Sequence, residues 1–388
     1  MPDPLASLID DESTRQRLFP ITRAKIFLNH AAVTTLPAPV TQAMNEFNGS
    51  WSTDFPDYAN MLALYADARK TAAELLHASP DEIALLGPTS LGLSLIALGL
   101  PWQPGDEVLC YFDDYPANVY PWLELRRRGV EVRFLQSAAL GQITPDLVGA
   151  NLSSRTRLVA LASCNFVSGY RIDLNEIGRR LRERSILFCV DAIQTLGAFP
   201  TTVENVDFLS ADAHKWLLGP LSSGVLYVRR EHLETCRPAL LGSWNTVSPN
   251  FAAQNEIAFV PGAQRYEPGA LNASGIIGVR TAMRLLLDLG IERVAARISG
   301  LRAHLAEGLR ALGVEPLGPD NPSDAAGILT VRHPGIDAAS LHQALTAEGI
   351  ICSLRQDRQG TAYVRFSPHF YNTEAELNHV LGILAKTR

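Results

Sequence analysis

The chain has 388 residues, of which 47% are hydrophobic and 19% charged, and its formal net charge is −6. This composition is typical of a globular protein with a sizeable core, and it excludes a disordered or fibrous chain. The acidic balance, without an extended basic run, argues against nucleic-acid binding. The most apolar stretch, 91–100, is too short to span a membrane.

The five cysteines are dispersed and form neither a CxxC pair nor a Cys/His metal pattern. An odd, dispersed set fits a reducing compartment. The N-terminal sequence MPDPLASLIDDEST also lacks the charged-then-apolar layout of a signal peptide. We therefore expect a cytoplasmic protein that holds no metal and binds no membrane.

Short apolar runs alternate with amphipathic segments from about residue 82 onward. The runs are rich in Val, Ile and Leu, as expected for strands that are buried on both faces. Helical patterns at 117–128 and 174–184 lie between them. This alternation predicts an α/β fold with a mainly parallel, seven-stranded sheet and helices on both faces. The predicted strands are 82–86, 107–110, 131–135, 158–162, 186–190, 206–210 and 224–228.

The pattern changes after Pro261. Two long helical patterns follow, with Gly290 as the stop between them. Short strands and two further helices fill the rest of the chain. We expect a large domain over 21–270 and a smaller α+β domain over 271–388, with the N-terminal segment 1–20 packed on the smaller one. The predicted helices of this part are 273–289, 292–312, 338–348 and 373–387.

Polar residues follow several predicted strands at their carboxyl ends, where ligands of open α/β sheets bind. Thr89 and Ser90 stand where a helix begins, so they either bind an anion or cap that helix. Asp191 ends an apolar strand and needs a cationic partner, either a pyridinium N–H or a basic side chain; a helix cap is the further alternative. Gln194, one turn further on, could reach the same ligand.

Lys215 follows the strand 206–210 among Ala, Trp and Leu side chains. Burial there would lower the pKa of its amine and make it a better nucleophile toward an aldehyde, although a single lysine more often reaches the surface. Tyr115 could stack on a flat ring or be a loop aromatic. Taken together, these residues match the phosphate, ring, pyridine nitrogen and aldehyde of pyridoxal 5'-phosphate (PLP).

From FLNHAA at 27–32 to SPHFYNTEAEL at 367–377, the sequence resembles the class V aminotransferase and cysteine desulfurase group of fold-type I PLP enzymes. The most specific stretch is VDAIQTLGAFPTTVENVDFLSADAHKWLLGP, which is similar to the family's Asp-to-Lys segment. The resemblance implies that Lys215 carries the cofactor as a Schiff base and then shuttles protons. It implies that Asp191 keeps the pyridine nitrogen protonated.

Other cofactor contacts are implied in the same way. Gln194 would touch the ring oxygen, and Tyr115 would take the stacking position. Thr89 and Ser90 would bind the phosphate, with His214 nearby.

Substrate contacts are implied by the outer motifs of the family. Asn29 and His30 would lie near the substrate, and Arg365 would bind its α-carboxylate unless it forms a surface ion pair. Asn165, in SCNFVSG, is a further cofactor candidate, offset or substituted relative to the family's motif.

Two departures from the family bear on the function. Desulfurases carry a reactive cysteine on a loop, whereas the comparable segment SLRQDRQGTAYVRF has none, and Cys352 before it is interpreted as structural. A persulfide-forming desulfurase is therefore disfavoured. The threonine that family members often donate to the partner's phosphate is Ala270 here, so that contact falls to the backbone, to Asn272, or is absent. The resemblance also implies a homodimer.

We therefore expect a PLP-dependent enzyme that acts on an α-amino acid. Amino transfer is favoured, with a C–S or other β-lyase reaction next and epimerisation third. A non-catalytic protein of the same fold is a remote alternative, disfavoured by the presence of Lys215, Asp191 and Arg365. A dinucleotide-dependent oxidoreductase is disfavoured because no GxGxxG follows the first strand.

Overall fold

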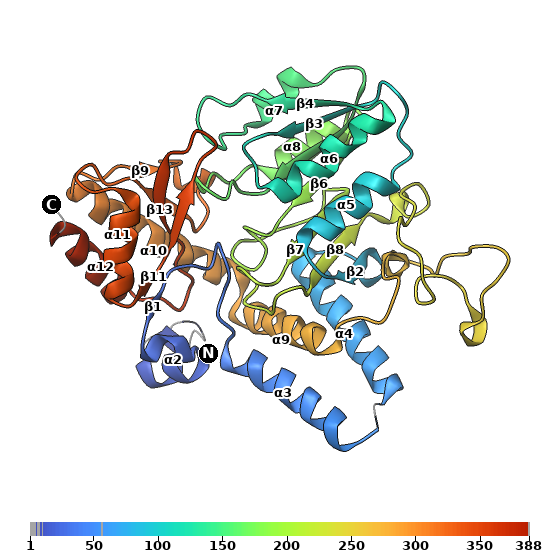
Figure 1. Cartoon of the computed structure of the whole chain (residues 1–388), viewed down its shortest axis with the longest axis horizontal. Coiled ribbons are helices and arrows are strands. Elements are labelled where there is room, and N and C mark those ends of the chain that lie inside the picture. Colours follow the sequence, from blue (N-terminus) through green and yellow to red (C-terminus); the bar gives the residue numbers. More distant parts are fainter. Residues whose placement is uncertain (1–4, 6–7, 10, 56, 387–388) are drawn as a thin grey trace.

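A seven-stranded sheet forms the centre of the larger part of the chain in the computed structural model, which describes residues 5, 8–9, 11–55 and 57–386 (Figure 1). The strand order is β2-β8-β7-β6-β5-β3-β4. Neighbours pair in parallel except β8, which is antiparallel to both β2 and β7. The predicted α/β fold is confirmed. The strands are β2 (Ile83–Leu86), β3 (Glu107–Tyr111), β4 (Glu131–Leu135), β5 (Thr156–Ala162), β6 (Leu187–Asp191), β7 (Phe208–Asp212) and β8 (Gly224–Val228).

Helices cover both faces of this sheet because its strands are apolar on both faces. In β3, Leu109 joins the core on one face, while Val108 and Cys110 join the core on the other. The first face packs on α4 (Tyr58–Leu76), α8 (Leu174–Arg182) and α9 (Ala273–Leu289), and the second on α5 (Thr89–Gly99) and α6 (Tyr120–Glu124). Further helices, 3-10 turns aside, are α3 (Ala38–Thr53), which packs on α9, and α7 (Pro145–Asn151), which packs on α8.

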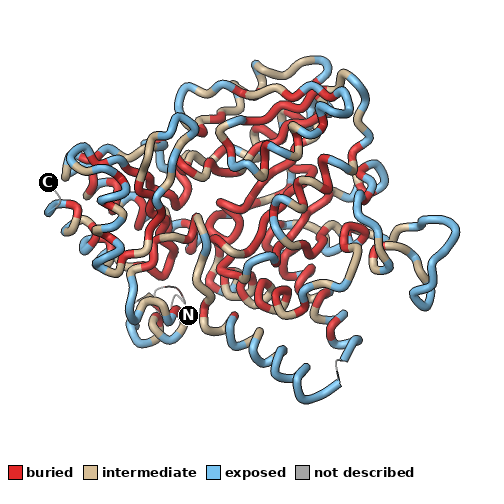
Figure 2. Tube along the Cα trace, in the orientation of Figure 1, coloured by how far each residue is buried: buried red, intermediate tan, exposed pale blue. Residues whose placement is uncertain are grey.

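The smaller domain has an antiparallel sheet of four strands in the order β12-β13-β10-β9. Its core is separate from those of the large sheet, and both interiors are visible in Figure 2. The elements are α10 (Ile291–Ala311), β9 (Pro316–Leu317), β10 (Leu329–Val331), α11 (Ala338–Ala347), β11 (Ile350–Ile351), β12 (Ser353–Gln356), β13 (Ala362–Phe366) and α12 (Glu374–Lys386).

The division placed at residue 270 assigns α9 to the smaller domain, but α9 packs elsewhere. Val279 and Met283 share a core with the large sheet, and the helix lies against α3 and α4. The sequence pattern could not show this, because an amphipathic helix does not indicate which surface covers its apolar side.

The N-terminal segment lies against the end of the chain. Strand β1 (Ile26–Phe27) pairs in parallel with β11. Before it, helix α2 (Glu12–Leu18) carries Arg15, whose guanidinium lies 2.8 Å from Glu376, and the ring of Phe19 stacks on Tyr371 with centroids 4.0 Å apart. We predicted that the segment 1–20 packs on the smaller domain, and residues 1–4, 6–7 and 10 of this segment lie outside the described residues.

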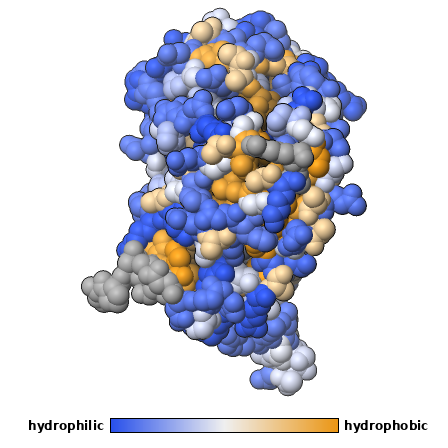
Figure 3. Space-filling view, turned by 90° about the vertical axis from the view of Figure 1, so that its left-hand side faces the viewer, coloured by the Kyte–Doolittle hydropathy of each residue, from blue (hydrophilic) through white to orange (hydrophobic). Residues whose placement is uncertain are grey.

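Figure 3 shows one face of the outer surface. Seen from the side of the small domain, it is largely hydrophilic with separate apolar patches (Figure 3). Among the described residues, no helix combines the length and apolarity that crossing a bilayer requires.

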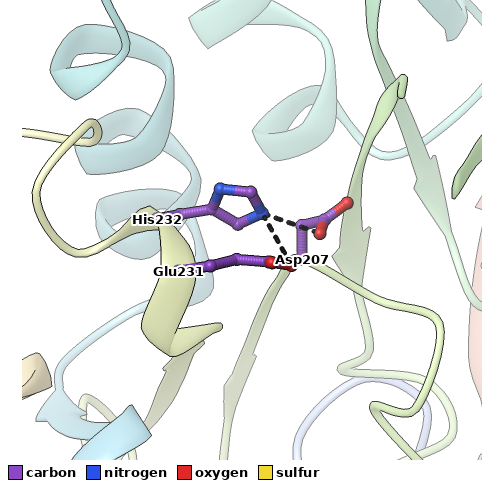
Figure 4. Close-up of side chains that lie close together, drawn as sticks. All are labelled: Asp207, Glu231 and His232. Atoms are coloured by element: carbon purple, nitrogen blue, oxygen red, sulfur yellow. Dashed lines mark hydrogen bonds and ion pairs between the residues drawn. The ribbon is translucent and has the colours of Figure 1, made fainter.

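Among the described residues, one group of side chains has ligand atoms close enough together to hold a metal ion. It lies at the amino end of β7 and consists of Asp207, Glu231 and His232 (Figure 4). Arg229 lies 3.5 Å from Asp207 and 3.7 Å from Glu231. Asp207 also accepts the backbone N–H of Phe188 at 2.7 Å. Because a guanidinium already neutralises these carboxylates, we interpret the group as an ion-pair cluster that fixes the start of the strand.

Two buried histidines join the N-terminal segment to both domains. His30 donates from Nδ1 to the carbonyl of Ser367 and accepts from the Tyr371 hydroxyl, both at 2.9 Å. His369 donates from Nε2 to the carbonyl of Trp216 at 3.0 Å and accepts the N–H of Phe370 at Nδ1. Each ring therefore needs one unprotonated nitrogen. Burial lowers the pKa of His369 to about 4 and that of His30 well below its ordinary value.

These histidines make the fold acid-sensitive. Because the folded pKa of His369 lies below that of the unfolded chain, the unfolded state binds more protons between about pH 6.5 and pH 4, and stability falls as the pH falls through that window. We expect His369 to account for a loss of about 2 kcal/mol between pH 7 and pH 5. Urea unfolding of His369→Gln should show a shallower pH dependence than wild type. The exposed His379→Gln should match wild type, and equal slopes in all three proteins would contradict the prediction.

Candidate active site

A cavity of about 340 Å³ opens at the carboxyl ends of the parallel strands, between the two domains and the N-terminal segment. It brings together residues that are far apart in the sequence. Its polar lining residues are Thr89, Ser90, Tyr115, Asp191, Gln194, His214, Lys215, Arg355 and Arg365, and the backbone of 31–33 closes one side.

Lys215 follows β7 and is the buried amine of this cavity, with only 7% of its surface exposed. Burial lowers the pKa of Lys215 to about 8, opposed by the charge of Asp191 and helped by those of Arg365 and Arg355. Its Nζ lies 5.3 Å from the centroid of the Tyr115 ring. A useful fraction of the amine is therefore uncharged near neutral pH, as a nucleophile toward an aldehyde requires.

Asp191 is the last residue of β6 and is buried. Its Oδ1 accepts the N–H of Ile193 at 3.0 Å. Burial raises the pKa of Asp191, while the positive charge of Lys215 lowers it. A carboxylate held in this way can keep a proton on a ring nitrogen beside it.

Helix α5 begins at Thr89, and no side chain caps its first turn, because the N-cap residue is Pro88. Thr89 Oγ1 accepts the N–H of Asp212 at 2.9 Å, which ties the helix to the end of β7. A Cβ at Gly92 would collide with the side chain of Ser210, so only glycine allows this close packing. The uncapped helix N-terminus, with Ser90 beside it in the cavity, is suited to a phosphate.

Gln194 is fixed at both ends of its amide. Its Nε2 donates to the carbonyl of Ala31 at 3.1 Å, and its Oε1 accepts from the Trp216 indole at 2.8 Å. His214 also lines the cavity, with Nδ1 3.0 Å from Asp212. Gln194 thus reaches the cavity from a position that two hydrogen bonds hold.

Arg365, on β13, is only 1% exposed and comes from the small domain. It donates to the carbonyl of Phe166 and, at 3.4 Å, to the Ser353 hydroxyl, while its buried Nε has no partner. Burial lowers the pKa of Arg365 to about 9, and the charge of Arg355 adds to this. No carboxylate of the described residues forms an ion pair with it, so a substrate carboxylate fits.

Three predicted residues lie outside the lining of the cavity. Asn29 accepts from the Ser353 hydroxyl, which in turn accepts from Arg365, so two hydrogen bonds link it to that guanidinium through Ser353. His30 is fully buried at the domain junction. Asn165 donates to the carbonyl of Asp113 and holds its own turn through Oδ1. Their predicted contacts with substrate or cofactor stay predictions.

Asp114 and Arg355 are functional candidates that no motif indicated. Asp114 accepts from Tyr115, Asn118 and Ala162, and so positions the loop that carries the ring of Tyr115. Burial and the charge of Asp191 raise the pKa of Asp114 to about 7. Its sequence signal was only a second Asp in the run YFDDYP.

All five cysteines are free and buried, and none lines the cavity. Burial raises the pKa of Cys352 to about 12, so its thiol stays protonated. Asn272, the alternative to the missing threonine, accepts the N–H of Gly275 and caps α9.

These residues fit PLP: a buried amine, a buried carboxylate, an aromatic ring and an open helix N-terminus border one cavity. The chain has four lysines. We expect borohydride treatment of the PLP-loaded protein to attach the cofactor to Lys215 and to no other lysine, as measured by peptide mass spectrometry. Lys215→Ala should lose the label, while Lys70→Ala, at an exposed position, should keep it. A label that survives in Lys215→Ala would contradict the assignment.

The chain is similar to known proteins over nearly its whole length. The family model Aminotransferase class-V matches residues 26–380. Probable cysteine desulfurases of Pyrococcus abyssi and Methanothermobacter thermautotrophicus are 29% and 28% identical, over 94% and 93% of this chain and 94% of each relative.

Two solved structures share the fold at 24% identity. Cysteine desulfurase from Thermococcus onnurineus NA1 in its apo form has a TM-score of 0.89 and covers 100% of this chain and 98% of its own. The cystine C–S lyase C-DES, in complex with its product cysteine persulfide, has a TM-score of 0.86, with coverage of 95% and 99%. The chain belongs to the class V aminotransferase family and is a PLP-dependent enzyme, as predicted.

Proposed function

We propose that this enzyme is a lyase that cleaves a C–S or related bond at the β-carbon of an α-amino acid. The likeness to probable cysteine desulfurases supports C–S cleavage over the amino transfer favoured from the sequence. This likeness carries the proposal, and the cavity, which holds an amine for proton transfer and a guanidinium for a carboxylate but no thiol, separates the lyase from a persulfide-forming desulfurase. A persulfide-forming desulfurase would need such a thiol.

Amino transfer is the second candidate. It is favoured by the family's description and by the uncharacterized aminotransferase YcbU of Bacillus subtilis, which is 25% identical over 96% of this chain. The two reactions use the same residues up to the removal of the Cα proton, so the arrangement of side chains supports both.

The chain's own residues would act as follows. Bound PLP supplies a ring that accepts the negative charge left at Cα. Lys215 would hold the cofactor through Nζ, and its uncharged Nζ would accept the proton from the substrate Cα. Asp191 keeps a proton on the ring nitrogen, and Arg365 binds the α-carboxylate. Thr89 and Ser90 bind the phosphate at the start of α5.

The products distinguish the two reactions. With cystine, whose far end carries a carboxylate, elimination should release cysteine persulfide, ammonia and pyruvate over many turnovers and return the starting visible spectrum of the holoenzyme. Transamination should convert the cofactor to pyridoxamine phosphate, with one keto acid released for each site. Spectra recorded together with ammonia and keto-acid assays check this. Stoichiometric keto acid without ammonia would refute the lyase, and a protein that gains no visible band with PLP would refute both.

The enzyme is further proposed to be a homodimer. Apolar side chains are exposed near the α3–α4 turn and on the loop 240–260, which projects from the large domain in Figure 1. Phe55 is 88% and Phe251 66% exposed, and Tyr58 and Trp244, from the two segments, lie with ring centroids 5.8 Å apart. Exposed apolar side chains on two segments that meet in this way mark a protein interface.

Light scattering should therefore give about twice the chain mass of 42.3 kDa. The double substitution Phe55→Ser and Phe251→Ser should shift the protein toward monomer, because it removes apolar area from the proposed interface. Leu354→Ser, exposed on the small domain, serves as the matched control. A wild-type monomer at micromolar concentration would contradict the proposal.

A further inference from the structure

A second guanidinium faces the cavity beside Arg365. In the pairing of β12 with β13, Ser353 lies opposite Arg365, and Arg355 lies two residues further along β12. Because side chains of a strand alternate between faces, Arg355 shares the face of Ser353 and Arg365. Both arginines border the cavity that contains Lys215.

Arg355 has no partner for its charge within the described chain. Its Nε is buried without a hydrogen-bond partner, and the described residues provide neither an ion pair nor a hydrogen bond for the rest of its guanidinium. Burial lowers the pKa of Arg355. By contrast, Arg358 on the adjoining loop is exposed and pairs with Asp113. An unpaired, partly buried cation is costly unless an anion joins it.

The charges of the cavity leave Arg355 unassigned. The lining contains three basic side chains besides His214, namely Lys215, Arg355 and Arg365, against one carboxylate, Asp191. In the proposed function, Lys215 holds the cofactor, Asp191 serves its ring nitrogen and Arg365 takes the α-carboxylate. The phosphate has the N-terminus of α5.

We propose that Arg355 binds a second anionic group of the substrate, so that the enzyme selects acidic α-amino acids, whose side chain ends in a carboxylate or a sulfur oxyanion. The inference rests on the proposed function for the place of the α-carboxylate at Arg365. A planar guanidinium binds either oxyanion through two parallel N–H donors. A neutral side chain would leave Arg355 buried and unpaired.

The test is calorimetric titration of the PLP-loaded enzyme with acids that lack an amine and cannot react. Succinate is compared with butyrate, which has the same chain length and one carboxylate. We expect succinate to bind at least tenfold more tightly. 3-Sulfopropanoate replaces one carboxylate by a sulfonate, so its affinity relative to succinate tells which oxyanion is preferred.

Arg355→Gln should reduce the preference for succinate to within twofold and leave butyrate unaffected. The matched control is Arg332→Gln, an exposed arginine beside β10 in the same domain, which should keep the wild-type preference. Circular dichroism and PLP affinity are measured on every variant. Arg355→Lys, which keeps the charge without the planar fork, should retain part of the preference.

Equal affinities for succinate and butyrate in the wild type would overturn the inference, even if Arg355→Gln does not fold. A variant that binds PLP more weakly but still prefers succinate would also overturn it, and would place Arg355 at the cofactor phosphate. Because no turnover is needed, the result is independent of the reaction. A diacid preference in a protein that does not eliminate would refute the lyase and retain the inference.

Discussion

The removal of the Lys215 amine from water is the constraint on which the site depends. An ammonium group next to bulk solvent would stay charged and would not attack an aldehyde at neutral pH. Here β7 delivers the lysine to the inner end of a cavity, and burial lowers its pKa to about 8. Asp191, at the end of the neighbouring strand, limits that shift. The negative charge of Asp191 raises the pKa of Lys215, and the positive charge of Lys215 lowers the pKa of Asp191.

That burial requires three parts of the chain at once. The sheet supplies the floor, the N-terminal segment covers one side through Ala31, and the small domain adds the arginines. Gln194 and Trp216 connect the first two parts, and His369 connects Trp216 to the third. The walls of the cavity are thus joined by hydrogen bonds between buried groups, which are costly to leave unpaired.

The fold and the centre of the site could be predicted because their signals are local. Apolar runs marked the seven strands, and the residues just after them, such as Asp191 and Lys215, fall at one edge by topology. The sequence analysis predicted neither α3 nor α4. Helix α3 is largely exposed, and its hydrophobic pattern is weak. The position of Asn29 behind Arg365 depends on packing between segments more than 300 residues apart, which no single-sequence pattern contains.

The role of Arg355 could not be predicted from the sequence either. Its neighbours in sequence, SLRQDRQG, read as an ordinary polar hairpin. Only the register of β12 against β13 shows that this arginine, and not the next one, faces the cavity. Strand alternation could have assigned the face, but the bounds of such short strands are not set by composition.

The parallel pairing of β1 with β11 has a consequence for how the protein is made. Residues 26–27 find their partners only at 350–351, so this contact spans nearly the whole chain. During synthesis on the ribosome, the apolar side chains of β1 stay exposed until the small domain has been made. Contacts of such long sequence separation form slowly, and exposed strand edges aggregate. The active site is therefore completed last, and a chain that ends before β11 lacks both the partner of β1 and the two arginines of the cavity.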